Sequence, residues 1–201
     1  MLRALLFDMD GTITRPHIDW KTLRELVGAP DGMTIMAYLD TLAPPDQARA
    51  SAILEEVETE AAEQAVLNPG AAELLCQVRA CPLKLALITN NHRRAMLRIV
   101  EKFSLDFDLL LSREDAPVKP APDLLLLALE RFNLRPAEAW FVGDGRYDQE
   151  ASQAAGIRYL HLAHDPQAPI EGPAIYTLNE LWFFLAQEGL QPPQNDFHVT
   201  Q

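Results

Sequence analysis

The stretch LRALLFDMDGTIT, residues 2–14, decides the fold, because its apolar run at residues 2–7 stops at the acidic residues Asp8 and Asp10. Similar runs occupy residues 83–89, 107–111 and 140–142, with weaker ones at 159–163 and 174–178. Runs that are apolar at nearly every position are typical of strands in a parallel sheet covered on both faces. We therefore predict a buried parallel sheet whose strands end at polar residues.

Helical patterns separate these predicted strands. Apolar residues recur at helical spacing in residues 68–79, 92–103, 122–132, 148–155 and 179–187. We expect Asn68 to cap the first of these helices and Gly156 to end the fourth. Strands that alternate with helices of this length form right-handed βαβ units. The predicted fold is therefore α/β, with a doubly wound, Rossmann-like parallel sheet.

A long interruption follows the first strand. Between Thr14 and Asn68 no convincing strand occurs, and helical spacing is found at residues 19–27 and again at 50–65, after a break at Pro44-Pro45. This stretch is too long for an ordinary βα loop. We expect a small all-helical insertion at residues 15–68, an α/β core made of residues 1–14 and 69–188, and a loosely ordered polar tail at 189–201.

The composition is that of an acidic globular protein. The 201 residues include 29 Asp and Glu against 17 Lys and Arg, a formal net charge of −12. Such a chain repels a phosphate backbone, so we expect no nucleic-acid partner. No apolar run approaches the roughly 20 residues that span a bilayer, and the start is not that of a signal peptide. We expect a cytoplasmic protein without a membrane partner, in which Cys76 and Cys81 are reduced, buried thiols.

Polar side chains follow several of the predicted strands, where ligands bind to open parallel sheets. They are Asp8 and Asp10 after residues 2–7, Thr89 and Asn90 at the end of the run 83–89, Asp144 and Asp148 after 140–142, and Lys119 in the segment VKPAPD. The four carboxylates and one ammonium sum to −3. A divalent cation with oxygen ligands would relieve this repulsion, and Mg²⁺ suits carboxylates, water and substrate phosphate. Without Cys or His in the set, zinc is a poor candidate.

The chemistry expected of this set is metal-assisted phosphoryl transfer. With a cation bound, the remaining carboxylates could serve as a nucleophile and as an acid and base. The Lys119 ammonium and the Thr89 hydroxyl would donate to a transferring phosphoryl group.

Four motifs resemble those of the haloacid dehalogenase superfamily. The segment DMDGT at residues 8–12 resembles the first motif, LITNN at 87–91 the second, Lys119-Pro120 the third and VGDGRYDQEASQAAG at 142–156 the fourth. All four occur in family order, and the helical insertion lies where the family places its cap. The resemblance covers about residues 1–188 and implies a phosphatase similar to phosphoglycolate phosphatases.

The resemblance implies a role for each acidic residue. Asp8 would attack phosphorus to form an aspartyl-phosphate, and Asp10 would protonate the leaving oxygen and then deprotonate the attacking water. Mg²⁺ would be held by the Asp8 carboxylate, the Asp10 main-chain carbonyl and Asp144. Asp148 would support a metal-bound water or Lys119.

Other residues would bind the substrate, a small soluble phosphomonoester. Thr89 and Lys119 would neutralise phosphoryl oxygens, helped by main-chain N–H groups around Asn90 and after Asp8. Three further candidates follow Asp10 closely: Gly11 and Thr12 within the first motif, and Arg15, which could contact the leaving group. Two departures from the family pattern are Gly145, where a hydroxyl residue is usual, and the shortness of the insertion.

Three alternatives share parts of this pattern. A haloacid dehalogenase would need neither Mg²⁺ nor an acidic residue at position 10. A phosphomutase of the β-phosphoglucomutase type would use both. A receiver domain, phosphorylated on Asp as a switch, would have adjacent acidic residues after its first strand and its target Asp after its third, where this chain has Ser112-Arg113. No motif in the insertion identifies the leaving group, and none indicates an oligomeric state.

Overall fold

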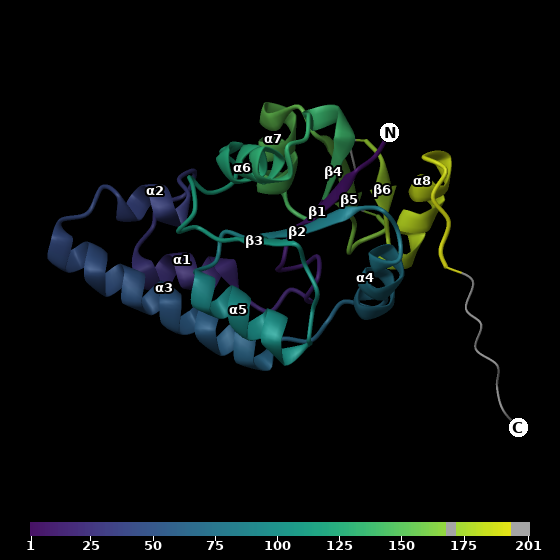
Figure 1. Ribbon diagram of the computed structural model, residues 1–201. Helices are drawn as coiled ribbons and strands as arrows, with labels where there is room; N and C mark the ends of the chain where they lie inside the picture. Colours follow the sequence, from purple (N-terminus) through teal and green to yellow (C-terminus); the bar gives the residue numbers. More distant parts are fainter. Residues whose placement is uncertain (168–171, 194–201) are drawn as a thin grey trace, which may run out of the picture.

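The computed structural model describes residues 1–167 and 172–193, and at its centre lies a sheet of six parallel strands (Figure 1). Neighbouring strands pair in the order β3-β2-β1-β4-β5-β6. The strands are β1 (Ala4–Phe7), β2 (Lys84–Ile88), β3 (Leu109–Leu111), β4 (Ala139–Gly143), β5 (Arg158–Leu162) and β6 (Ala174–Ile175). The predicted parallel sheet is confirmed, and each predicted run overlaps one strand.

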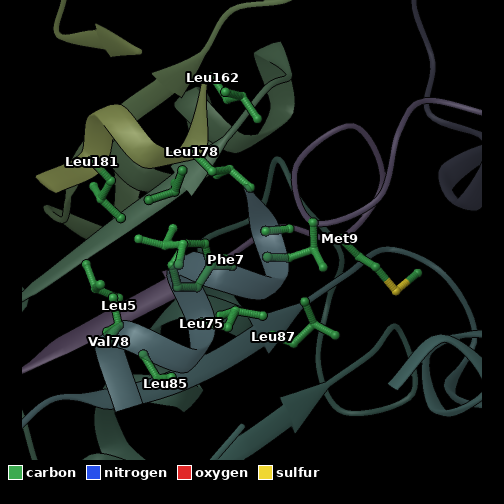
Figure 2. Close-up of a cluster of buried hydrophobic side chains, with 14 of the residues drawn as sticks. Leu5, Phe7, Met9, Leu75, Val78, Leu85, Leu87, Leu162, Leu178 and Leu181 are labelled. Carbon is green, nitrogen blue, oxygen red and sulfur yellow. The ribbon is translucent and has the colours of Figure 1, made fainter. Parts of the chain in front are cut away.

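Helices cover both faces of this sheet, which confirms the doubly wound arrangement. On one face α4, α5 and α8 join the buried cluster that contains Leu5 and Phe7 of β1. On the other face α6 and α7 join the cluster that contains Leu6. Figure 2 shows Phe7 in the first cluster with Leu75 of α4. The helices are α4 (Ala71–Arg79), α5 (Arg93–Lys102), α6 (Asp123–Phe132), α7 (Arg146–Ala155) and α8 (Leu181–Gln187), with short 3₁₀ turns at Pro136–Glu138 and Leu178–Glu180.

The helical segment between β1 and α4 has a small hydrophobic cluster of its own. It contains α1 (Trp20–Val27), α2 (Ile35–Leu39) and α3 (Pro44–Gln64), whose buried apolar side chains pack together. Asp19 caps α1 by accepting from two backbone N–H groups. The proline pair begins α3 instead of preceding it, because proline fits the first helical turn. The five-residue α2, with Thr34 as its N-cap, is too short to show a periodic pattern and was not predicted.

Three sequence predictions need correction or lie outside the structure. Asn68 does not cap α4, because its side-chain amide donates to the carbonyl oxygens of Gly11, Thr12 and Thr14 at 2.7, 2.8 and 3.1 Å. Cys76 is exposed and not a buried thiol. Of the predicted tail at 189–201, residues 194–201 lie outside the described part of the chain. Within the described part of the chain, no helix has the length and apolar character needed to cross a bilayer.

The order of strands determines where a ligand can bind. From β1 the chain passes to β2 and β3 on one side, and it then crosses to β4, β5 and β6 on the other. A crevice opens beyond the carboxyl ends of the strands where the direction of winding reverses. This reversal lies between β1 and β4, which are followed by Asp8 and Asp144.

Candidate active site

Two buried ion pairs connect three segments at the carboxyl edge of the sheet. The Lys119 ammonium lies 2.5 Å from Asp8 Oδ1 and 2.6 Å from Asp148 Oδ1. It also donates to the carbonyl oxygen of Ile88 at 3.3 Å. All three charged side chains are buried, so a single cation balances two desolvated carboxylates.

A third carboxylate joins this cluster and completes a group that can hold a cation. Carboxylate oxygens of Asp8, Asp144 and Asp148 all lie within 4.8 Å of one another. The donors are oxygens without nitrogen or sulfur, and together with Lys119 they carry a net charge of −2. A hard divalent ion such as Mg²⁺ therefore fits this set in charge and in ligand type.

Glycines make room for these carboxylates. Gly11 has φ +86, and a Cβ built there would lie 2.0 Å from Asp144 Oδ2. A Cβ at Gly143 would lie 2.7 Å from the Asp148 carboxylate. The Gly145 N–H donates to Asp148 Oδ2 at 3.0 Å, which caps α7 and fixes this side chain. Only residues without a side chain allow such close approach of the two loops.

The electrostatics of the cluster follow from burial. Burial and the neighbouring Asp148 raise the pKa of Asp8 well above its usual value, although Lys119 opposes the shift. Burial likewise raises the pKa of Asp10 to about 6, against the attraction of Lys119. Burial alone would lower the pKa of Lys119, but the Asp148 and Asp8 carboxylates outweigh this effect and raise it. The site thus concentrates negative charge that a bound cation would stabilise.

The loop after β2 contacts this cluster residue by residue. The Thr89 hydroxyl accepts from the Asn91 N–H at 3.1 Å. The Asn90 side chain pairs with the main chain of Lys119, accepting from its N–H at 2.9 Å and donating to its carbonyl oxygen at 2.8 Å. The Asn91 side chain lines the cavity together with Asp10 and lowers the pKa of that carboxyl group. The loop is thereby tied to the main chain of Lys119.

A cavity of about 500 Å³ opens over these groups, between the sheet edge and the helical segment. From the core it is lined by seven of the predicted residues together with neighbouring side chains, and from the helical segment by apolar, aromatic, polar and charged residues. The seven predicted core residues are Asp8, Asp10, Thr89, Asn90, Lys119, Asp144 and Asp148. The helical segment contributes Trp20, Arg24, Thr34, Ile35, Met36, Leu54 and Glu58.

Three predicted residues do not line this cavity. Gly11 and Thr12 are buried beneath it, and the Thr12 hydroxyl has no hydrogen-bond partner among the described residues. Arg15 is exposed, and its backbone N–H donates to the carbonyl oxygen of Val66. Its predicted contact with a leaving group finds no support in this geometry.

Sequence reasoning missed two residues that contact the site. His164 Nε2 lies 3.3 Å from Asp144 Oδ2, and the Asn68 amide holds the backbone that follows Asp10. His164 follows β5 after one intervening residue and comes directly after the predicted run at 159–163, so its position after a strand was the available signal. Nothing local marked Asn68, because the carbonyls that it binds are more than 50 residues away.

Comparison with known proteins gives a consistent family match. The family described as haloacid dehalogenase-like hydrolase matches residues 14–162, a range that begins just after the first motif. A haloacid dehalogenase-like hydrolase domain-containing protein of Arabidopsis thaliana is 32% identical over 161 residues, which cover 75% of this chain and 66% of that protein.

Two further relatives carry more specific names. An N-acetylmuramic acid 6-phosphate phosphatase of Pseudomonas putida is 30% identical over 195 residues, which cover 82% of this chain and 87% of that protein. A crystal structure of a candidate phosphoglycolate phosphatase from Lactobacillus plantarum superposes with a TM-score of 0.71 at 27% identity, over 90% of this chain and 97% of that one.

Proposed function

Because this chain belongs to the haloacid dehalogenase-like hydrolases, we propose that it is a Mg²⁺-dependent phosphatase that hydrolyses a small soluble phosphomonoester. The relatives named as phosphatases of phosphorylated compounds support this proposal. The observation that carries it is the meeting of Asp8, Asp144 and Asp148 with Lys119 at one cavity. This arrangement supplies a nucleophile, an oxygen-ligand set and a cation for phosphoryl oxygens.

In the proposed reaction Asp8 and Asp10 share the covalent steps. An Asp8 carboxylate oxygen forms a bond to phosphorus while the bond from phosphorus to the leaving oxygen breaks, and Asp10 gives its proton to that oxygen. Asp10 then takes a proton from water, the water oxygen bonds to phosphorus, and the bond to Asp8 breaks. Inorganic phosphate leaves, and both carboxyl groups return to their starting states.

The remaining groups stabilise the charge of the transferred phosphoryl group. The Lys119 ammonium and the Thr89 hydroxyl donate to its oxygens, since both line the cavity beside Asp8. Mg²⁺ would be held by Asp8, the Asp10 carbonyl oxygen and Asp144, with Asp148 close by. When bound, it would neutralise phosphoryl charge as a Lewis acid.

The helical insertion at residues 15–68 would act as a cap over the core of residues 1–14 and 69–188. Seven of its side chains line the cavity, so it would contact the leaving group and exclude bulk water. The ~500 Å³ cavity suits a small molecule. We place this chemistry in the cytoplasm, with a phosphorylated metabolite as the partner.

A receiver-like switch is not favoured. Such a switch needs its phosphorylated Asp after the third strand, and here β3 is followed by Ser112, whose hydroxyl donates to Glu114 and Asp115. A phosphomutase finds no specific support in the site.

Replacement of the nucleophile tests the proposed function. Asp8→Asn should abolish release of phosphate from a generic aryl phosphate in the presence of Mg²⁺, with the far-ultraviolet circular dichroism of the folded protein unchanged. Asp46→Asn is the matched control, because Asp46 is exposed on α3 and should retain full turnover. Undiminished turnover in Asp8→Asn rejects the proposal. A metabolite panel with and without Mg²⁺ would then identify the leaving group.

A further inference from the structure

A buried carboxylate of the helical segment contacts two loops of the core. Glu58 of α3 lies with its Oε1 and Oε2 2.5 and 2.7 Å from Arg113 Nη1, after β3. Glu58 Oε2 also accepts from the backbone N–H of His92 at 2.9 Å. The side chains of Glu58 and Arg113 are only 2% and 8% exposed. Both oxygens of this carboxylate are thus occupied by core donors.

The His92 ring adds contacts to the same helix. His92 Nε2 lies 3.2 Å from the Glu55 carbonyl oxygen and 3.3 Å from Thr59 Oγ1. His92 Nδ1 accepts from the Ala95 N–H and caps α5. Figure 1 shows α3 and α5 side by side, as these contacts require.

This contact lies at the end of the loop that approaches the phosphoryl site. Before His92 in the chain, Asn91 and Thr89 line the cavity, and Asn90 pairs with the Lys119 main chain. Loop residues 89–91 therefore face the reacting groups, whereas residue 92 is held by Glu58. Movement of the Glu58 carboxylate would therefore displace the loop of residues 89–92 at its last residue.

An exposed charge pair between α3 and α5 serves as a comparison for the buried Glu58 contact. Glu63 of α3 lies 4.0 Å from Arg98 of α5, and the side chains are 58% and 57% exposed. Exposed pairs of this kind contribute little, because solvent screens them. Removal of the buried Glu58 carboxylate would by contrast leave the His92 N–H without its acceptor and Arg113 with only the exposed Glu55 carboxylate, 4.0 Å away.

We propose that Glu58 is a positioning residue of the active site. Its carboxylate fixes the loop of residues 89–92 against Arg113, and the helical segment thereby sets the position of the groups that bind the phosphoryl unit. This inference rests on the proposed function, and it assigns to α3 a role in binding phosphate in addition to covering the cavity.

The test compares Glu58→Gln with Glu63→Gln, the same substitution at a buried and at an exposed position of one helix. The single carbonyl oxygen of Gln can accept from His92 or Arg113, but it cannot replace both carboxylate oxygens. Glu58→Gln should lower kcat about tenfold and weaken binding of inorganic phosphate and vanadate by a similar factor, since small displacements of positioning groups are costly. Glu63→Gln should match the wild-type protein in all three measurements.

Binding of phosphate and vanadate is measured by calorimetry, without turnover, so this result is independent of the proposed reaction. A wild-type protein without phosphatase activity would contradict the proposed function, while the binding comparison would still test Glu58. Arg113→Lys keeps the cation and loses the planar fork, and it should weaken phosphate binding in the same direction if Glu58→Gln does not fold. Equal phosphate affinity and kcat in Glu58→Gln and Glu63→Gln, whatever their thermal stabilities, would overturn the inference.

Discussion

The carboxyl edge of the sheet and the helical segment of residues 20–64 contribute to one cavity, but they are built differently. The side chains of β1 are completely buried, and the groups that follow β1 and β4 are held by ion pairs and by glycine-lined turns. The helical segment has a small cluster and leaves Trp20 44% and Leu26 58% exposed. Groups on buried strands can be held to a fraction of an ångström, whereas exposed side chains of the helical segment are free to adapt to a leaving group.

This difference predicts separate kinetic signatures. Substitutions at the sheet edge should reduce turnover, since they remove charge that acts on the reacting phosphoryl group. Substitutions in the helical segment should change KM, because its side chains contact the leaving group. Glu58 is the predicted exception, since it belongs to the helical segment and acts on the core.

The largest effect is expected for Lys119→Met. Without the ammonium, Asp8 and Asp148 face each other in a buried site, and removal of one partner from a buried pair costs about 3–5 kcal/mol of stability. Turnover should fall by more than about 10³-fold, because the phosphoryl oxygens lose their cation. Denaturant unfolding and phosphate release check the two effects. A stable variant with near-normal turnover would remove Lys119 from the site.

A smaller effect is expected for Asp144→Asn. This change keeps the shape of the side chain and removes one charge from the oxygen-ligand set. The Mg²⁺ concentration for half-maximal activity should rise at least about tenfold, with partial recovery of kcat at high Mg²⁺. Titration of activity with Mg²⁺ gives the result, and Asp46→Asn is the control. An unchanged Mg²⁺ requirement would contradict the assignment of Asp144 as a ligand.

Trp20→Ala should affect binding alone. Trp20 lines the cavity from α1, so its removal should raise KM for an aryl phosphate about threefold to tenfold and leave kcat within about twofold. Leu26→Ala, an exposed position on the same helix outside the cavity lining, should change neither constant. A fall in kcat with unchanged KM would contradict the prediction that the helical segment acts on substrate binding and the sheet edge on turnover.

The smallest effect concerns the pH dependence of stability. Burial raises the pKa of Glu58 to about 7, although Arg113 and the His92 N–H oppose this shift. The folded protein therefore holds a proton that the unfolded chain loses near its usual value of 4.5, and the free energy of unfolding should fall as pH rises from about 4.5 to 7. In Glu58→Gln the free energy of unfolding should fall less steeply between about pH 4.5 and 7 than in the wild-type protein, which denaturant unfolding at several pH values measures. Identical slopes in the two proteins would contradict the prediction.

The sequence allowed the core to be predicted because its information is local. Apolar runs of strand length, followed by Asp8, by Asn90-Asn91 or by Gly143-Asp144, identified both the strands and the edge at which polar groups meet. Parallel pairing then brings these positions together without knowledge of side-chain contacts. Lys119 was placed with them as the cation of the segment VKPAPD, which precedes the predicted helix at residues 122–132, and the resemblance of Lys119-Pro120 to the third motif agreed with this.

Contacts over long sequence separations could not be predicted in the same way. Glu58 and Arg113 are 55 residues apart, and their pairing depends on how α3 docks against the core. The amide of Asn68 acts on carbonyls 54–57 residues earlier, although its local pattern favoured a helix cap. The short α2 lacked the length that a periodic pattern requires.

The most direct test of the central claim is to locate the phosphoryl group during turnover. Wild-type protein and Asp10→Asn are mixed with an aryl phosphate and Mg²⁺, quenched rapidly in acid, and examined by peptide mass spectrometry. The account predicts one phosphoryl group on Asp8, accumulating in Asp10→Asn because the base that activates water is absent. A phosphoryl group on another residue, or turnover by Asp8→Asn at the wild-type rate, would contradict it.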